Sequence, residues 1–229
     1  MVRVKLCGMM SEADVAMAEE AGADAVGFVT EYPVPVPWNL TREEAARLVR
    51  AASPFVTTVA VVGGTVDEIL DIARKVMPNV LQLHGDESLA EILAIIDGLA
   101  DTGIRVIKAL RIDVDTGLAR FEKTDPVRAA KALEGSGIAA LIVDSKTASM
   151  PAGTGVALDQ DVAARVSEAV KIPLILAGGL TAVNVAEAVL KVRPYAVDVI
   201  TGVEREPGVK DKKKMEEFVK AAKGLDAER

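Results

Sequence analysis

The feature that most limits the possible folds of this chain is a repeated succession of a short apolar segment and an amphipathic helical segment. The apolar segments are bounded by glycine, proline or polar residues and cover 2–8, 25–30, 55–62, 80–84, 104–110, 139–143, 174–177 and 196–200. A strand that is apolar throughout is buried on both faces, as in a parallel sheet covered by helices. The repeat of roughly 25–30 residues matches the strand–helix unit of an α/β barrel. We therefore predict an α/β protein, a (β/α)8 TIM barrel, with residues 1–229 as one domain.

Capping signals support the helical segments between the predicted strands. Thr41 with Glu44 and Thr65 with Glu68 have the spacing of a capping box, in which each side chain binds the other residue's backbone N–H. Residues 111–125 are mixed and polar, and we predict a loop there. The pattern thus predicts short connections throughout and no linker between domains.

An open, doubly wound sheet is the main structural alternative. Such sheets usually carry a glycine-rich dinucleotide fingerprint directly after the first strand. Here the first strand is followed by CGMMSE, which is not such a fingerprint. The closed barrel is therefore favoured.

Composition narrows the class of protein and its partners. Half of the 229 residues are hydrophobic but only 3% are aromatic, so aliphatic side chains must build the core. The net charge of −7 argues against nucleic-acid binding, which needs a basic surface. The single cysteine excludes an internal disulfide, the first residues do not form a signal peptide, and no apolar run approaches the length of a membrane span. We expect a cytoplasmic protein that binds neither membranes nor nucleic acids.

Polar groups or glycines stand at the end of nearly every predicted strand. In α/β barrels these ends meet at one face, where active sites lie. The residues at these positions are Cys7, Glu31, Gly63, Gly64, Gln82, His84, Lys108, Asp144, Gly178, Gly179, Asp198, Thr201 and Gly202. So many ionisable or glycine residues at one face predict a functional site.

Two of these residues have the chemistry of an acid and a base. Asp144 follows a run of aliphatic residues, and such surroundings raise the pKa of a carboxyl group, as a general acid requires. Its alternative role is a helix cap or a salt bridge. Cys7 is a candidate nucleophile or base if nearby cations favour the thiolate, and otherwise a small buried apolar residue. His84, the only histidine, has no cysteine or carboxylate at metal-ligand spacing, so we expect no metal site.

The segment PLILAGGLTAVNV indicates a binding site for a phosphate group. Gly178 and Gly179 end an apolar run, and glycines let backbone N–H groups approach a ligand closely. We expect Thr181 to open a helix whose N-terminus adds further donors. The glycines of the GTG sequence at 153–155 are candidates for additional donors. The alternative interpretation is a tight turn without a ligand.

Six motifs in the same order resemble the phosphoribosylanthranilate isomerase family of tryptophan biosynthesis, over nearly the whole chain. They are VKLCGMMSEADV near the start, LQLHGDE at 81–87, LIVDSK at 141–146, GTG at 153–155, LILAGGLTAVNV and DVITGVE at 198–204. The resemblance implies a cofactor-independent Amadori rearrangement of a phosphosugar, N-(5-phosphoribosyl)anthranilate. We expect the protein to be a monomer or homodimer.

The resemblance also implies roles for individual residues. Cys7 corresponds to the family's general base and Asp144 to its general acid. Gly153, Thr154 and Gly155, together with Gly178, Gly179, Thr201 and Gly202, correspond to its phosphate site. Gln82, His84 and Asp198 match positions that line the substrate pocket.

The chain departs from the family pattern after the second predicted strand. Many members carry Ser-Pro-Arg there, with the arginine facing the anthranilate carboxylate, whereas this chain reads Val-Pro-Trp at 36–38. Trp38 is therefore a candidate to stack on the anthranilate ring. Arg3, Lys5 and Lys108 are the candidate cations for the carboxylate.

Other functions remain open on the residues alone. A pentose-phosphate epimerase would need metal-binding histidines at several strand ends, and there is one histidine. A tryptophan synthase α subunit would need two catalytic carboxylates, for which Glu31 and Asp86 are weaker candidates than Cys7 with Asp144. A barrel that binds phosphosugars without catalysis would need neither Cys7 nor Asp144.

Overall fold

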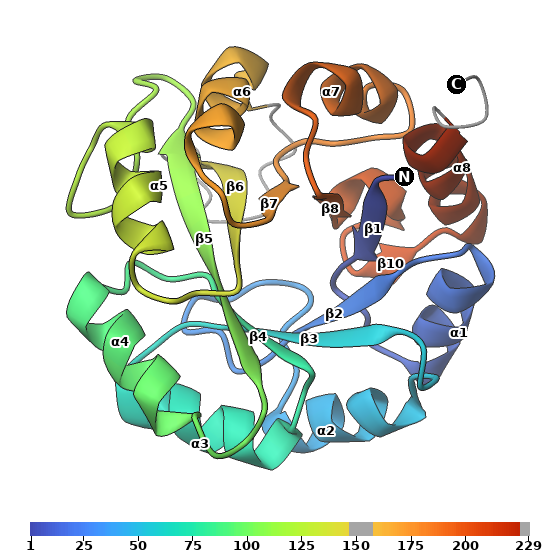
Figure 1. Ribbon diagram of the computed structural model, residues 1–229. Coiled ribbons are helices and arrows are strands. Elements are labelled where there is room, and N and C mark those ends of the chain that lie inside the picture. Colours follow the sequence, from blue (N-terminus) through green and yellow to red (C-terminus); the bar gives the residue numbers. More distant parts are fainter. Residues whose placement is uncertain (147–157, 225–229) are drawn as a thin grey trace.

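The segments predicted as strands lie side by side in the computed structural model, which describes residues 1–146 and 158–224. Each strand is parallel to its two neighbours, and the first pairs with the eighth, so the sheet closes into a barrel (Figure 1). The strands are β1 (Arg3–Leu6), β2 (Ala25–Val29), β3 (Thr57–Val62), β4 (Val80–Leu83), β5 (Arg105–Asp113), β6 (Ala140–Lys146), β7 (Leu174–Leu176) and β8 (Ala196–Val199). The predicted (β/α)8 barrel is confirmed.

Helices surround the barrel and cover its outer face (Figure 1). They are α1 (Glu12–Glu20), α2 (Arg42–Ala51), α3 (Val66–Val76), α4 (Leu89–Gly98), α5 (Pro126–Glu134), α6 (Gln160–Ala169), α7 (Val185–Val192) and α8 (Lys212–Lys223). Thr41 with Glu44 and Thr65 with Glu68 form the predicted capping boxes at α2 and α3. Within residues 1–146 and 158–224, no helix has the length and hydropathy needed to cross a membrane.

The core has two layers because side chains alternate along each strand. In β5, Ile107 and Ala109 belong to a small apolar cluster inside the barrel. Val106 and Leu110 belong to the larger cluster, which includes the buried faces of the helices. This alternation determines which side chains at a strand end point toward the barrel axis.

Several boundaries differ from the prediction. Phe55 is 97% exposed and precedes β3, which begins at Thr57. β5 continues to Asp113, through the start of the predicted loop, because its residues 107–113 pair with β6. α7 begins at Val185 rather than Thr181, because Asn184 closes a turn by accepting the Thr181 N–H and donating to the Gly179 carbonyl.

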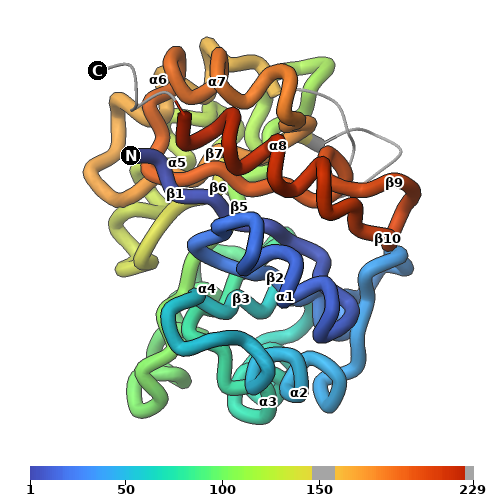
Figure 2. Tube along the Cα trace, turned by 90° about the vertical axis from the view of Figure 1, so that its right-hand side faces the viewer, coloured from blue at the N-terminus to red at the C-terminus, as the bar shows by residue number. Residues whose placement is uncertain are grey.

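The two ends of the barrel differ in what they carry. Figure 2 shows both described chain ends on one side and a two-stranded hairpin, β9 (Glu204–Glu206) and β10 (Val209–Lys210), on the other. The irregular segment after β2 lies next to this hairpin, because Trp38 binds Glu204. The carboxyl ends of the strands point toward the hairpin end.

Candidate functional site

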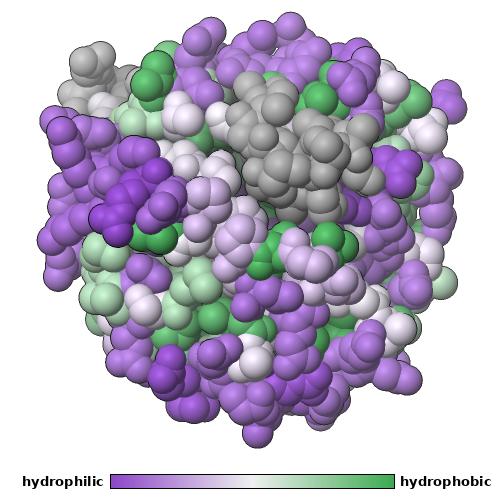
Figure 3. Space-filling model, turned by 180° about the vertical axis from the view of Figure 1, so that it is seen from behind, coloured by the Kyte–Doolittle hydropathy of each residue, from purple (hydrophilic) through white to green (hydrophobic). Residues whose placement is uncertain are grey.

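A pocket opens at the carboxyl ends of the strands and gathers most of the predicted site residues. Figure 3 views this face, where apolar and weakly polar residues lie near the centre and hydrophilic ones around the edge. The predicted residues that line the pocket are Cys7, Trp38, Gln82, His84, Asp144, Gly178, Gly179, Asp198 and Thr201. These residues come from five of the eight strand ends and from the segment after β2.

Cys7 follows β1 with its side chain inside the barrel and 1% of its surface exposed. Gly27 of β2 lies at the same level and makes room for it. A Cβ atom at Gly27 would lie 2.5 Å from Cys7 Sγ and 3.1 Å from Lys5 Cε. Such distances are far below van der Waals contact, so the position of the thiol depends on this glycine.

Replacing Gly27 with alanine is expected to lower kcat by roughly 100-fold, because the thiol must move by about 1 Å or more. Steady-state kinetics of the purified variant would measure this, with Gly135→Ala as the control. Gly135 ends α5 with a φ of −68°, and an added Cβ there would approach no described atom closer than 3.5 Å. Wild-type kcat in Gly27→Ala would show that catalysis tolerates displacement of Cys7.

Lys5 places a positive charge beside the thiol, two residues earlier on the same inward face of β1. Its Nζ donates to both carboxylate oxygens of Asp198, at 2.9 Å each. Burial raises the pKa of Cys7 above its ordinary value, while the Lys5 ammonium opposes this shift. The resting thiol is thus protonated, and Lys5 is the group that stabilises its thiolate when the thiolate forms.

Asp144 stands on β6 with only 14% of its side chain exposed. Burial, followed by the nearby charge of Asp198, raises the pKa of Asp144 to about 7. Its Oδ1 accepts the backbone N–H of Ser145 at 2.7 Å. A carboxyl group with this pKa holds a proton through a large part of the neutral pH range and can act as an acid.

Gln82 and His84 alternate along β4 and both reach the pocket. Gln82 Nε2 lies 3.1 Å from His84 Nδ1, and an amide nitrogen is a donor, so the ring carries its hydrogen on Nε2. Burial and then the charge of Arg111 lower the pKa of His84 to about 3, which keeps the ring neutral. His84 Nε2 lies 3.6 Å from Asp144 Oδ2 and has no hydrogen-bond partner among the described residues. It is therefore available to donate to a ligand beside Asp144.

The glycine turns after β7 and β8 lie together at the side of the pocket away from His84. Gly178 and Gly179 have φ values of +90° and +62°, which suit glycine. A Cβ at Gly202 would lie 2.0 Å from the Leu180 carbonyl oxygen, so this glycine lets the two turns touch. The helix dipole predicted from Thr181 is not here, because α7 starts later. Gly153, Thr154 and Gly155 lie outside the described residues.

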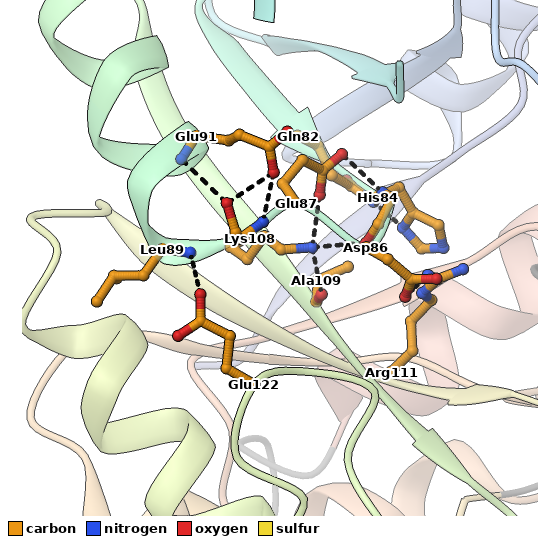
Figure 4. A network of polar contacts seen from close by, with 12 residues as sticks. Gln82, His84, Asp86, Glu87, Leu89, Glu91, Lys108, Ala109, Arg111 and Glu122 are labelled. Carbon is orange, nitrogen blue, oxygen red and sulfur yellow. Dashed lines mark hydrogen bonds and ion pairs between the residues drawn. The ribbon is translucent and has the colours of Figure 1, made fainter. Parts of the chain in front are cut away.

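The structure does not bring Lys108 to the pocket. Lys108 points out of the barrel, and its Nζ binds Glu87 Oε2 and the Gly85 carbonyl oxygen, each at 2.8 Å (Figure 4). It stands one residue before Ala109, which points inward, so strand alternation turns it away from the pocket. Its role is to fasten the segment after β4 to β5.

Trp38 forms part of the pocket wall and is 2% exposed. Its Nε1 donates to Glu204 Oε1 at 2.6 Å, and Lys210 Nζ binds the same oxygen at 2.7 Å. The hairpin β9–β10 therefore holds the indole in place. Gly8 allows the ring to approach, because a Cβ there would lie 2.9 Å from Trp38 Cδ1.

Two residues near the pocket were not predicted as site residues from the sequence. Arg111 belongs to the extended part of β5 and is almost fully buried. Tyr32 lines the pocket and donates its hydroxyl hydrogen to the His84 carbonyl oxygen at 3.0 Å. Counting alternate residues from Ile107 along β5 would have placed Arg111 on the inward face, but only if the strand were known to continue.

The pocket as a whole offers a carboxyl group, a thiol group and backbone N–H donors. In the part of the chain that the structure describes, no three His, Cys, Asp or Glu side chains form a group that would hold a metal ion. Asp144 and Cys7 come from β6 and β1, which are separated by two strands around the barrel. They can thus approach one small molecule from different sides.

Comparison with known proteins agrees with this geometry. A family model described as N-(5′-phosphoribosyl)anthranilate (PRA) isomerase matches residues 4–221. The N-(5′-phosphoribosyl)anthranilate isomerase of Haloferax volcanii is 44% identical and covers 97% of this chain and 94% of its own. The crystal structure of phosphoribosyl anthranilate isomerase from Thermotoga maritima has a TM-score of 0.80 and 34% identity, covering 98% of this chain and all of that one. A phosphoribosyl anthranilate isomerase in complex with reduced 1-(o-carboxyphenylamino)-1-deoxyribulose 5-phosphate has a TM-score of 0.77 and 33% identity, with the same coverage.

Proposed function

Since the chain belongs to the N-(5′-phosphoribosyl)anthranilate isomerase family, we propose that it performs this isomerisation with Asp144 as the acid and Cys7 as the base. The observation that carries the proposal is that these two side chains line one pocket, where burial keeps the carboxyl protonated up to about pH 7. A phosphosugar is the substrate. The reaction is an Amadori rearrangement in which only protons move between enzyme and substrate.

The proposed steps balance without a redox partner. Asp144 gives its proton to the ring oxygen of the ribose, and the C1′–O bond breaks as the nitrogen lone pair forms a C1′=N bond. The Cys7 thiolate then removes the proton from C2′, giving an enolamine. The enolamine takes up a proton at C1′ and loses the hydroxyl proton at C2′, which leaves the ketone. His84 Nε2–H is placed to bind a substrate oxygen next to Asp144.

We assign the phosphate to the backbone N–H groups around Gly178, Gly179 and Thr201. These residues line the pocket, and Gly178 and Gly179 present no side chain to a ligand. Gly202 supports the site by letting the two turns touch, and residues 153–155 are predicted to add donors. A dianionic group bound here puts the sugar between Cys7 and Asp144.

Turnover of N-(5′-phosphoribosyl)anthranilate by the purified protein tests the function directly. The decay of substrate fluorescence is expected to accelerate in proportion to enzyme concentration. A protein that binds the reduced product without turning substrate over would instead be a non-catalytic barrel. The alternative functions, an epimerase and a tryptophan synthase α subunit, have no comparable set of residues in the pocket.

The pH profile of kcat/KM is expected to bend near pH 7. Below this pH Asp144 is protonated, while the Cys7 thiolate, whose pKa is raised, increases tenfold per pH unit. Above it, loss of the Asp144 proton offsets the gain in thiolate, so the profile levels off. Initial rates measured from about pH 6 to about pH 9 would give this profile. A profile that is flat below pH 7 and falls above it would contradict the raised pKa of Cys7.

Several expectations from the sequence stay predictions. They are the single domain over residues 1–229, the absence of a cofactor, the cytoplasmic location, and the monomeric or homodimeric state. Light scattering on the purified protein would decide between the two oligomeric states.

A further inference from the structure

Arg111 is a buried cation beside the proposed acid, and no step described above uses it. It follows Ile107 and Ala109 at alternate positions, so it has the inward orientation of these residues. In the β5–β6 pairing it stands directly opposite Asp144. Only 4% of its side chain is exposed. Neighbouring strands are about 4.8 Å apart, so a small molecule at Asp144 is within reach of the guanidinium.

The guanidinium faces a second cavity that adjoins the pocket. This cavity has a volume of about 320 Å³, and Tyr32 lines both spaces. Pro33 and Val34 give it an apolar wall, and Gly85 leaves part of it without a side chain. A six-membered aromatic ring that carries a carboxylate fits such a volume, and Tyr32 lies where the two spaces meet.

One partner of Arg111 is Asp86, a carboxylate that can leave. Arg111 Nη2 forms an ion pair with Asp86 Oδ1, and Figure 4 shows the two side chains next to each other near His84. The Asp86 side chain is 56% exposed, and its other oxygen lies 3.9 Å from the exposed Arg120. Asp86 can therefore turn toward Arg120 while another carboxylate takes its place. A guanidinium matches carboxylates through paired N–H groups.

We propose that Arg111 binds the carboxylate of the anthranilate ring and so selects the substrate. The inference rests on the proposed function, because that substrate carries its carboxylate ortho to the nitrogen on C1′. The oxygen that Asp144 protonates is bonded to the same C1′. A substrate oriented for proton transfer from Asp144 thus carries its carboxylate only a few bonds from the protonated oxygen. Arg111, the residue of β5 that pairs with Asp144, lies on that side of the substrate.

The other candidate cations for the anthranilate carboxylate lie away from this cavity. Lys5 is held by Asp198 below Cys7, and Lys108 is held by Glu87 outside the barrel. Arg3, at the start of β1, stacks on the Tyr195 ring at 4.3 Å. Arg111 is therefore the candidate cation that the fold places beside the pocket, in the wall of the adjoining cavity.

The test compares two reduced product analogues that differ only in the carboxylate: reduced 1-(o-carboxyphenylamino)-1-deoxyribulose 5-phosphate and its phenylamino counterpart. Calorimetric titration gives the affinity of each for wild type, Arg111→Met, Arg111→Lys and Arg128→Met. Arg111→Met is expected to weaken binding of the carboxylated analogue by roughly 10- to 100-fold and to leave the phenylamino analogue unchanged. Arg111→Lys is expected to lie between, and Arg128→Met, a change at an exposed arginine of α5, is expected to match wild type.

Two outcomes would overturn the proposal. Equal weakening of both analogues by Arg111→Met would mean that Arg111 only supports the fold, and unchanged affinity for the carboxylated analogue would mean that it makes no contact. Circular dichroism of each variant accompanies the titration, and Arg111→Lys provides the comparison if Arg111→Met does not fold. Wild-type protein that binds the carboxylated analogue through Arg111 without turnover would refute the isomerase function while leaving the carboxylate site in place.

Discussion

Replacing Cys7 with serine is expected to lower kcat by roughly 100- to 10,000-fold, the range for removal of a general base. The hydroxyl group is close in size to the thiol and fits beside Gly27. It is far less acidic, however, so Lys5 cannot hold a useful fraction of it as the anion. KM should change little, because the pocket keeps its shape. Fluorescence-based turnover and thermal unfolding of both proteins would measure the loss and verify the fold.

Cys7 is the only cysteine, so thiol alkylation reports on it alone. Replacing Lys5 with methionine and Asp198 with asparagine together is expected to slow alkylation at a fixed pH. Loss of the ammonium removes the main charge that lowers the pKa of Cys7, and the paired change avoids leaving Asp198 buried as a lone charge. A Cys7→Ser variant that keeps more than a third of the wild-type kcat would exclude Cys7 as the general base.

Replacing Asp144 with asparagine is expected to lower kcat by a similar factor, roughly 100- to 10,000-fold. The amide has the shape of the carboxyl group and can still accept the Ser145 N–H. It has no proton to give to the ring oxygen, so opening of the sugar ring becomes the slow step. Substrate binding should be nearly intact, which a split between kcat and KM would reveal.

Asp113→Asn is the matched control for this variant. Asp113 ends β5, two residues after Arg111, and accepts the Thr116 N–H at 2.9 Å. An asparagine there can accept the same bond, so wild-type kcat is expected. The pH profile adds a second criterion, because the bend near pH 7 should vanish in Asp144→Asn. A bend that persists in this variant would assign the titration to another group.

The sequence by itself determined the architecture and most of the strand-end residues. Apolar runs with glycine at their ends gave the strands, and capping pairs such as Thr41 with Glu44 gave the helix starts, because these signals are local. The order of the strands around a closed barrel then required Cys7 and Asp144 to meet at one face. No contact between distant residues had to be known for this result.

Tertiary structure decided which way the side chains at a strand end point. Lys108 and Arg111 are both cations on one strand, yet the first binds Glu87 outside the barrel and the second lines the cavity that adjoins the pocket. The sequence did not show this, because β5 is extended past Leu110 by its pairing with β6. Likewise, Trp38 is positioned by Glu204 and Lys210, which lie more than 160 residues away. Such contacts depend on the closed barrel, because only its closure brings the last strand and the segment after the second together.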